Sequence, residues 1–208
     1  MDADELAVVA SLVDLAFPAR GRVLPRDHRA LLGGALAARL PWLGVTPGTG
    51  LHHLNVAATE GPQVLLSART RLTLRVPRED AEAVAAALAG QTLDVGGQPL
   101  TLGAPQQREL LAHRTLYAHF VAAPSADEPA FLAMVNEELR ALGVACRPVV
   151  GRRQEVAGDA GSLTGFSLML DGLSQADALR VLLQGLGAHR RMGCGLFVPH
   201  KSAAAVGQ

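Results

Sequence analysis

The segment GLGAHRRMGCGLFVPHK, residues 185–201, holds the densest group of residues that could bind or transform a ligand. Its arginine pair, Arg190 and Arg191, is flanked by four glycines: Gly185, Gly187, Gly193 and Gly195. Glycine lets backbone approach a ligand closely, and arginine beside it can bind negative charge. The segment is not a dinucleotide fingerprint, because Arg190 stands at the third glycine position, and not a P-loop, because Cys194 stands where lysine is required. It predicts either an anion-binding loop or an ordinary glycine-bearing turn.

Seven histidines are candidate proton shuttles, because an imidazole pKa of about 6.5 allows proton transfer near neutral pH. His28 lies where a helix is expected to begin, and a helix N-terminus disfavours the imidazolium form. A neutral His28 is available as a base, although a capping or solvated histidine fits the same position. His52 and His53 follow the loop GVTPGTG and face opposite ways if they lie on a strand, so one of them is expected to be structural. His113 and His119 are expected to be structural residues of a strand. His189 and His200 flank the glycine-rich segment and could contact phosphate.

Composition excludes several classes of protein. The 208 residues are 49% hydrophobic and 3% aromatic, so the core must be aliphatic and fills one large domain or two small ones. Cys146 and Cys194 lack CxxC spacing, which argues against a disulfide framework or a zinc knuckle. No apolar run approaches the roughly 20 residues of a membrane helix, and acids open the chain where a signal peptide needs positive charge. We therefore expect a cytoplasmic protein with no metal site.

Charge is balanced overall but unevenly distributed. The 19 basic and 19 acidic residues cancel, so the net charge does not indicate a polyanionic partner. Residues 15–78, however, contain nine arginines against two acids, Asp27 and Glu60. Arginine suits bidentate phosphate contacts. This segment predicts either part of a basic face for nucleic acid or a solvated surface.

Hydrophobic periodicity predicts the order strand, helix, strand, strand, helix, strand in the first half. Asp27 is the expected N-cap of the first helix, in which Gly33 and Gly34 weaken the helix but permit close packing. The stretch 69–76 alternates Arg or Thr with Leu or Val, which predicts one polar face. The expected ranges are strands over 6–17, 51–57 and 69–76, a basic loop over 18–27, helices over 27–40 and 78–89, and a hairpin about 96–97.

The same order recurs in the second half. Ser125 with Glu128 forms a capping box before one helix, and Ser174 with Asp177 opens another. The expected strands cover 113–123, 144–150, 166–173 and 196–200, with a polar loop over 151–161. The fold class is therefore α+β, with two tandem ferredoxin-like (RRM-like) βαββαβ halves at 1–108 and 109–208.

These motifs resemble those of the CRISPR-associated endoribonucleases that cut precursor CRISPR RNA within its repeats, the Cas-six family. The segment GLGAHRRMGCG is similar to the family's glycine-rich loop, and FPARGRVLPRDH, GFSLMLDGLS and MGCGLFVPHK resemble its MYXAN-type branch. The resemblance covers most of the chain. It implies binding of a CRISPR repeat RNA stem-loop and a cut that needs neither metal nor cofactor, leaving 2′,3′-cyclic phosphate and 5′-hydroxyl ends. It also implies that the product is retained and passed to a multisubunit effector complex.

The resemblance also implies roles for residues. The family carries its catalytic histidine on or near the first helix, which implies His28, with His52 in reserve. A supporting tyrosine or lysine cannot be matched to Tyr117 or Lys201, although an arginine could supply positive charge. The residues expected to bind RNA are basic and lie in three segments: Arg22, Arg26, Arg152, Arg153, His189, Arg190, Arg191 and Lys201.

Two other functions fit the same fold. A non-catalytic RNA-binding subunit of a CRISPR ribonucleoprotein would share every feature except a working His28. A duplicated ferredoxin-like protein for small-molecule regulation or chemistry would use the glycine-rich segment to hold a nucleotide phosphate. Cleavage in EDTA separates the first alternative from an endoribonuclease, and thermal stabilisation by a nucleotide rather than by hairpin RNA would indicate the second.

Overall fold

The strand β1 (Leu12–Arg20) lies at the centre of the first sheet in the computed structural model, which describes residues 10–200. It pairs antiparallel with β6 (Arg71–Pro77), placing Leu15 opposite Leu74. The sheet has the order β3-β6-β1-β8-β7, with β9 also paired to β1. Its other strands are β3 (Gly50–Leu51), β7 (Thr92–Val95), β8 (Gln98–Leu102) and β9 (Gln106–Arg108).

Two helices bury their apolar faces in the core of this first half. α1 (His28–Ala37) contributes Leu32 and Leu36, and α2 (Ala81–Leu88), which follows the 3₁₀ turn η1 (Arg78–Asp80), contributes Val84 and Leu88. These positions recur at the helical spacing that the sequence shows.

The second half repeats the plan with four strands. The sheet has the order β11-β12-β10-β13, and its strongest pairing joins the two long strands β11 and β12 into a hairpin. Its elements are β10 (Thr115–Ala122), α3 (Glu128–Ala141), β11 (Arg147–Gly158), β12 (Gly161–Asp171), α4 (Gln175–Gln184) and β13 (Val198–Pro199).

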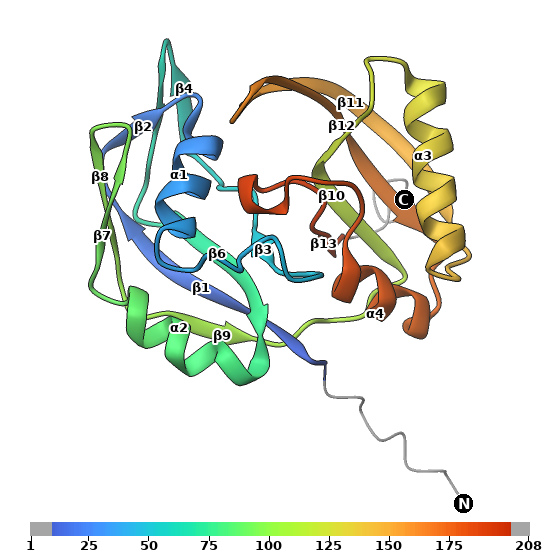
Figure 1. Cartoon of the computed structure of the whole chain (residues 1–208), viewed down its shortest axis with the longest axis horizontal. Coiled ribbons are helices and arrows are strands. Elements are labelled where there is room, and N and C mark those ends of the chain that lie inside the picture. The colour runs from blue at the N-terminus through green and yellow to red at the C-terminus, as the bar shows by residue number, and fades with distance from the viewer. Residues whose placement is uncertain (1–9, 201–208) are drawn as a thin grey trace, which may run out of the picture.

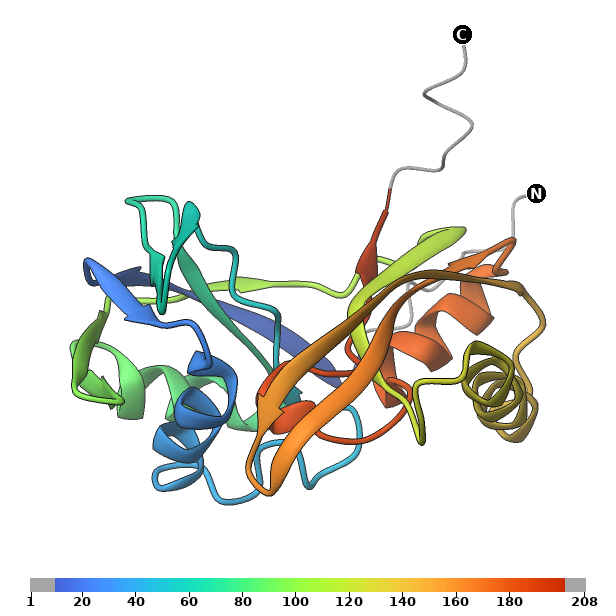
Figure 2. The same ribbon diagram turned by 90° about the horizontal axis from the view of Figure 1, so that it is seen from above.

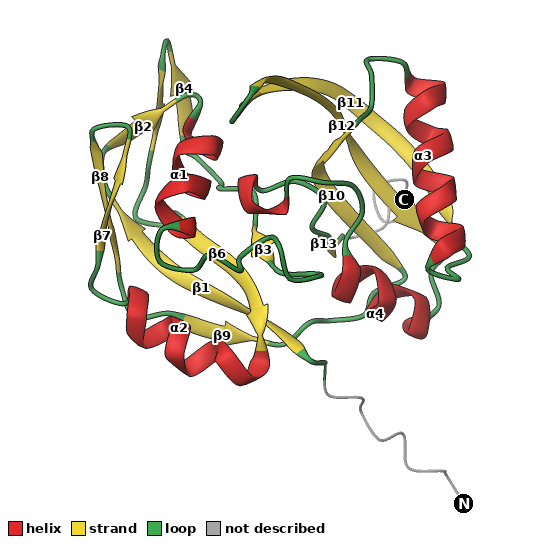
Figure 3. Cartoon of the chain, in the orientation of Figure 1, coloured by secondary structure: helices red, strands yellow, loops and turns green. Residues whose placement is uncertain are grey.

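Both sheets have the strand order of a ferredoxin-like fold. When the strands of each βαββαβ unit are counted along the chain, both sheets read 4-1-3-2, as β8-β1-β6-β3 and as β13-β10-β12-β11. Figure 3 shows each sheet with its own pair of helices. The predicted fold class, two tandem ferredoxin-like halves, is confirmed.

Each half has its own aliphatic core. Buried residues of the first core run from Val13 to Leu102, and those of the second from Leu116 to Phe197. The two halves lie side by side, with the loop that follows residue 184 and contains residues 190–192 between them (Figures 1 and 2). The division at residues 108 and 109 stays a prediction.

Two segments predicted as loops contain strands. β1 continues to Arg20, and β2 (Val23–Pro25) pairs with β5 (Gln63–Leu65), which also pairs with β4 (Ala58–Glu60) to form a third, small sheet. The predicted polar loop over 151–161 is mostly strand, because β11 runs to Gly158 and turns directly into β12. β2 is only three residues long, too short for a period to show. In β11, residues 151–153 are exposed one after another, so hydrophobic alternation stops there. The start of the first predicted strand, residues 6–9, lies outside the described residues.

Helix caps differ partly from the prediction. Ser174 accepts a hydrogen bond from the Asp177 backbone N–H at 3.1 Å, as expected. The capping box at Ser125 was wrong, because the N-cap of α3 is Asp127, whose carboxylate accepts from the Ala130 N–H at 3.0 Å. Asp27 occupies the N-cap of α1, but its side chain makes no capping bond.

Within residues 10–200, every helix is too short or too polar to cross a membrane.

Candidate active site and RNA interface

The four glycines of the C-terminal segment close a loop on itself. All four have positive φ, from 66° at Gly185 to 78° at Gly193, a region that side chains other than glycine rarely adopt. A Cβ atom at Gly195 would lie 1.9 Å from the Leu186 carbonyl oxygen, and the Leu186 N–H donates to the Gly195 oxygen at 3.0 Å. The close approach that glycine permits is, at this point, an approach of backbone to backbone.

The same loop docks on the first half through the 3₁₀ turn η2 (Arg190–Met192). Cβ atoms placed on Gly33, Gly44 and Gly50 would lie 2.6–2.9 Å from backbone atoms of Arg190 or Arg191. Close packing at Gly33 is therefore confirmed, whereas a Cβ atom placed on Gly34 would point into open space. The glycine-rich loop thus joins the two halves, and its predicted contact with RNA is untested.

The arginines of this loop are not freely solvated. Arg190 is partly buried, and its Nε is buried with no hydrogen-bond partner among the described residues. Burial lowers the pKa of Arg190 despite the attraction of Glu138. Arg191 lies 3.8 Å from the Asp159 carboxylate on the turn between β11 and β12. The other predicted RNA contacts are exposed, namely Arg22, Arg26, Arg152, Arg153 and His189, while Lys201 lies outside the described residues.

His28, the predicted catalytic residue, is the first residue of α1 and is 7% exposed. Its Nδ1 lies 3.1 Å from the Pro25 carbonyl oxygen. A carbonyl only accepts, so Nδ1 carries the proton and Nε2 is the nitrogen that can take one. Burial lowers the pKa of His28, with a further contribution from the positive charge of Arg29. The pKa of His28 is thus shifted in the direction expected of a base, and its largest cause is burial.

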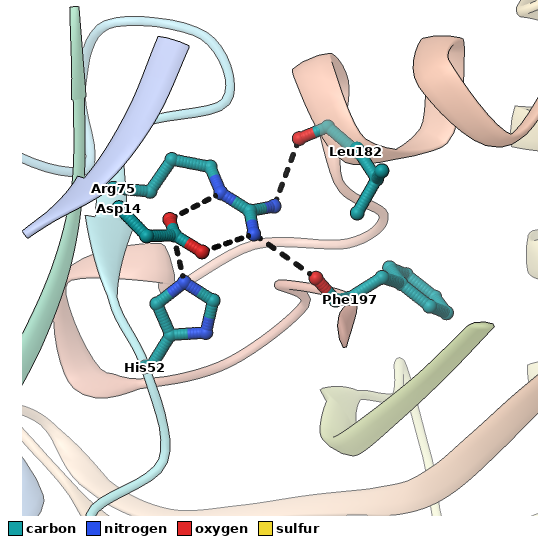
Figure 4. Close-up of polar contacts among 5 residues, drawn as sticks. All are labelled: Asp14, His52, Arg75, Leu182 and Phe197. Carbon is teal, nitrogen blue, oxygen red and sulfur yellow. Dashed lines mark hydrogen bonds and ion pairs between the residues drawn. The ribbon is translucent and has the colours of Figure 1, made fainter. Parts of the chain in front are cut away.

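His52, the reserve candidate, belongs to a buried ion-pair network (Figure 4). Its Nε2 donates to the Asp14 carboxylate at 3.1 Å, and Arg75 donates to both oxygens of the same carboxylate at 2.8 and 2.9 Å. Arg75 also donates to the carbonyl oxygens of Leu182 and Phe197, at 2.9 and 3.1 Å. Burial would raise the pKa of Asp14, but electrostatic attraction from His52 and Arg75 and the hydrogen bonds of both residues lower it well below its usual range.

This network corrects one prediction about β6. Thr73 and Arg71 lie on the polar face that the alternation predicts, but Arg75 on the same face is only 1% exposed. The second half covers this part of the face, since the carbonyls that bind Arg75 come from α4 and from the segment before β13. Arg75 therefore links the halves.

A second histidine cluster was not expected from the sequence. The rings of His53 and His119 stack with centroids 4.5 Å apart, and Tyr117 lies edge-on to His119 at 5.0 Å. Arg29 donates from Nη2 to His53 Nδ1 at 2.9 Å. Burial, followed by the charge of Arg29, lowers the pKa of His53 to about 3, and the same two causes lower the pKa of His119. The His53 ring is therefore neutral at physiological pH.

A cavity of about 670 Å³ lies between the halves. Three histidines, His52, His53 and His119, share its wall with basic residues of the first half, Arg69, Arg71 and Arg108. His28 is absent from the described residues that line it. His28 is nevertheless close enough to the cavity-lining His53 for its charge to contribute to the lowered pKa of His53.

Within residues 10–200, no three His, Cys, Asp or Glu side chains converge as metal ligands would.

Known proteins resemble this chain in sequence and in fold. The family model described as Cas6 Crispr matches residues 13–202. A curated relative, the CRISPR-associated endonuclease Cas6 of Myxococcus xanthus (strain DK1622), is 40% identical over 195 residues, covering 93% of this chain and 84% of the relative.

Solved structures share the fold at low sequence identity. A CRISPR associated protein Cas6 has a TM-score of 0.64 at 12% identity, covering 91% of this chain and 99% of that chain. Thermus thermophilus Cse3, bound to an RNA representing a pre-cleavage complex, has a TM-score of 0.54 at 12% identity, covering 92% of this chain and 100% of that chain. Because the family model spans nearly all of the described residues and the curated relative is 40% identical, this chain belongs to the Cas6 family.

Proposed function

We propose that this chain is a metal-independent endoribonuclease that cuts CRISPR repeat stem-loops in precursor CRISPR RNA. The observation that carries the proposal is a buried His28 whose pKa is lowered by burial and by the positive charge of Arg29, in a chain whose 40% identical relative is named a CRISPR-associated endonuclease. The proposed setting is the cytoplasm, where the precursor transcript is made.

The proposed reaction is an internal transesterification. His28 Nε2 takes the proton of the 2′-hydroxyl, and the O2′–P bond forms as the P–O5′ bond breaks in line. Water supplies a proton to the departing 5′-oxygen. The products are a 2′,3′-cyclic phosphate and a 5′-hydroxyl, so no oxidant or cofactor takes part.

The exposed arginines are proposed to hold the stem by its phosphates. A-form RNA offers side chains little base information in its major groove, so phosphate contacts position the helix and unpaired bases give sequence preference. Arg22, Arg26, Arg152 and Arg153 are exposed and suited to this role. The proposal includes retention of the product and its transfer to an effector complex.

The test is cleavage of a labelled repeat RNA in EDTA under single-turnover conditions. His28→Ala is expected to lower the rate by about 10² to 10⁴ while RNA affinity stays nearly unchanged. His113→Ala is the matched control, because His113 is exposed and outside the elements of the site. Undiminished cutting by His28→Ala would remove His28 from the mechanism, and loss of cutting in His52→Ala alone would transfer the role to His52.

RNA copurified from the host distinguishes the enzyme from a binding subunit. Short RNAs that end in cyclic phosphate, replaced by uncut precursor in His28→Ala, would establish substrate and reaction together. RNA with identical ends in both samples, combined with no cutting by the wild type in EDTA, would instead establish a non-catalytic RNA-binding subunit.

A further inference from the structure

Arg29 is a largely buried cation without a carboxylate partner in the described structure. It is the second residue of α1, and its guanidinium lies over the Phe120 ring with 5.5 Å to the centroid. None of the ion pairs formed within residues 10–200 includes it. The acids that share a small hollow with it, Asp27 and Glu155, do not pair with it. Burying a charge without a counter-charge is costly.

The hydrogen bonds of Arg29 leave donors available. Nη1 donates to the Gly193 carbonyl oxygen at 3.2 Å and Nη2 to His53 Nδ1 at 2.9 Å. The guanidinium has five N–H groups, and the others meet no oxygen or nitrogen acceptor within residues 10–200. Arg29 also donates a hydrogen bond to the Cys194 sulfur, but burial raises the pKa of this thiol to about 11, so it supplies no negative charge.

Arg75 shows how this protein neutralises an arginine that only links the halves. Both arginines donate hydrogen bonds to carbonyl oxygens of the second half, and both are shielded from solvent there. Arg75 is paired with the Asp14 carboxylate through two hydrogen bonds, whereas Arg29 faces a neutral imidazole instead. A structural link does not explain the missing counter-charge at Arg29.

The neighbours of Arg29 are chemically suited to an anion. His28 precedes it on α1, and His53 and His119 stack beside it, each with a pKa that burial lowers first and the charge of Arg29 lowers further. An anion bound at Arg29 would offset the positive charge that lowers the pKa of these three histidines. A planar guanidinium with parallel N–H groups fits a phosphodiester.

We propose that Arg29 is a catalytic residue that binds the scissile phosphate and stabilises the negative charge that develops on its non-bridging oxygens while His28 takes the 2′-hydroxyl proton. Arg29 itself makes and breaks no covalent bond. This inference rests on the proposed function and adds the group that holds the reacting phosphorus.

Single-turnover cleavage tests the role with a matched charge control. Arg29→Gln is expected to lower the rate by about 10² to 10³, with Arg29→Lys intermediate and RNA affinity changed by less than about fivefold, because several other arginines hold the stem. Arg39→Gln removes the same charge from an exposed position just beyond α1 and should cut at the wild-type rate. A wild-type rate in Arg29→Gln would overturn the proposal.

A sulfur substitution separates phosphate contact from a structural role. Replacing one non-bridging oxygen at the mapped cleavage site by sulfur should slow the wild type more for one diastereomer than for the other. Arg29→Gln should lose that difference, because its side chain no longer distinguishes the two oxygens. An unchanged difference, in a variant whose thermal unfolding is also lowered, would make Arg29 a structural residue only.

Inorganic phosphate tests the anion site even if no repeat RNA is cut. In wild-type protein labelled with ¹⁵N-histidine, phosphate should move the His53 resonances and raise the His53 pKa, and it should do neither in Arg29→Gln. Absence of cutting together with this response would refute the proposed function and keep the anion site. No response in the wild type would refute the site.

Discussion

Replacing Arg75 by methionine is expected to destabilise the protein more than any other single change at the interface between the halves. Methionine fills a similar volume without the charge. It leaves the Asp14 carboxylate, whose side chain is 15% exposed, with His52 as its one remaining partner in Figure 4. It also leaves the carbonyl oxygens of Leu182 and Phe197 without their donor.

The magnitude follows from the burial of the pair. Removing one partner of a buried ion pair costs about 3–5 kcal/mol, because the remaining charge is left uncompensated. For a chain of this size, each kcal/mol lowers Tm by about 2–4 °C, so the expected fall is roughly 6–20 °C. Thermal and urea unfolding of wild type and Arg75→Met measure it.

A double-mutant cycle isolates the pair itself. With Asp14→Asn also present, the carboxylate that Arg75→Met leaves unpaired is gone, so the double variant should be more stable than the sum of the single changes by about 1–2 kcal/mol. Additive effects would refute the conclusion that the Asp14–Arg75 pair is a stabilising buried ion pair. A loss below about 1 kcal/mol in Arg75→Met would refute it as well, because breaking a buried pair is expected to cost several kcal/mol.

The pH dependence has a definite sign. The folded pKa of Asp14 is lower than its unfolded pKa, which is about 3.9. The ionised carboxylate therefore contributes its full stability above the unfolded pKa, and this contribution is lost as pH falls towards the folded pKa. The stability difference between wild type and Asp14→Asn should stay constant above about pH 5 and shrink below about pH 4. A difference that grows on acidification would contradict the ion-pair geometry.

Three further sets of substitutions test the glycine-rich loop, the helix caps and the proposed RNA-binding surface. Gly195→Ala should destabilise the protein by at least about 1–3 kcal/mol, because it combines positive φ with a clash at the Leu186 carbonyl. Gly34→Ala, where the new Cβ meets open space, should instead stabilise α1 by roughly 0.5–1 kcal/mol. Urea unfolding should therefore show changes of opposite sign in the free energy of unfolding, and changes of the same sign would contradict this reasoning. Asp127→Ala and Ser174→Ala should each cost about 1 kcal/mol through a lost N-cap bond, and an equal cost for Ser125→Ala would contradict the assignment of Asp127 as the cap. Arg152→Glu with Arg153→Glu should weaken RNA binding and reduce its salt slope by about one for each lost phosphate contact, whereas an unchanged slope would remove β11 from the RNA interface.

The fold could be predicted because its signals are local. The repeated order of strands and helices, the apolar positions of α1 and the Ser174 cap each depend on residues a few positions apart, and spacing reveals them. The extensions of β11 and β12 towards their turn were missed because residues 151–153 are exposed one after another, so hydrophobic alternation stops there. The packing of Val156 and Leu163 near Phe120 depends on residues far away in the sequence. The position of His28 at the start of α1 was equally local.

The candidate site depends on contacts that spacing cannot show. Nine arginines between residues 15 and 78 look alike in the sequence, yet Arg75 is buried against an acid 61 positions away and against carbonyls 107 and 122 positions away. Arg29 differs from the other arginines because it donates a hydrogen bond to the carbonyl oxygen of Gly193, 164 positions away. An arginine is a solvated surface residue, a link between the halves or a candidate anion-binding group, depending on which residues pack against it. For Arg29 and Arg75 those residues include backbone of the other half of the chain.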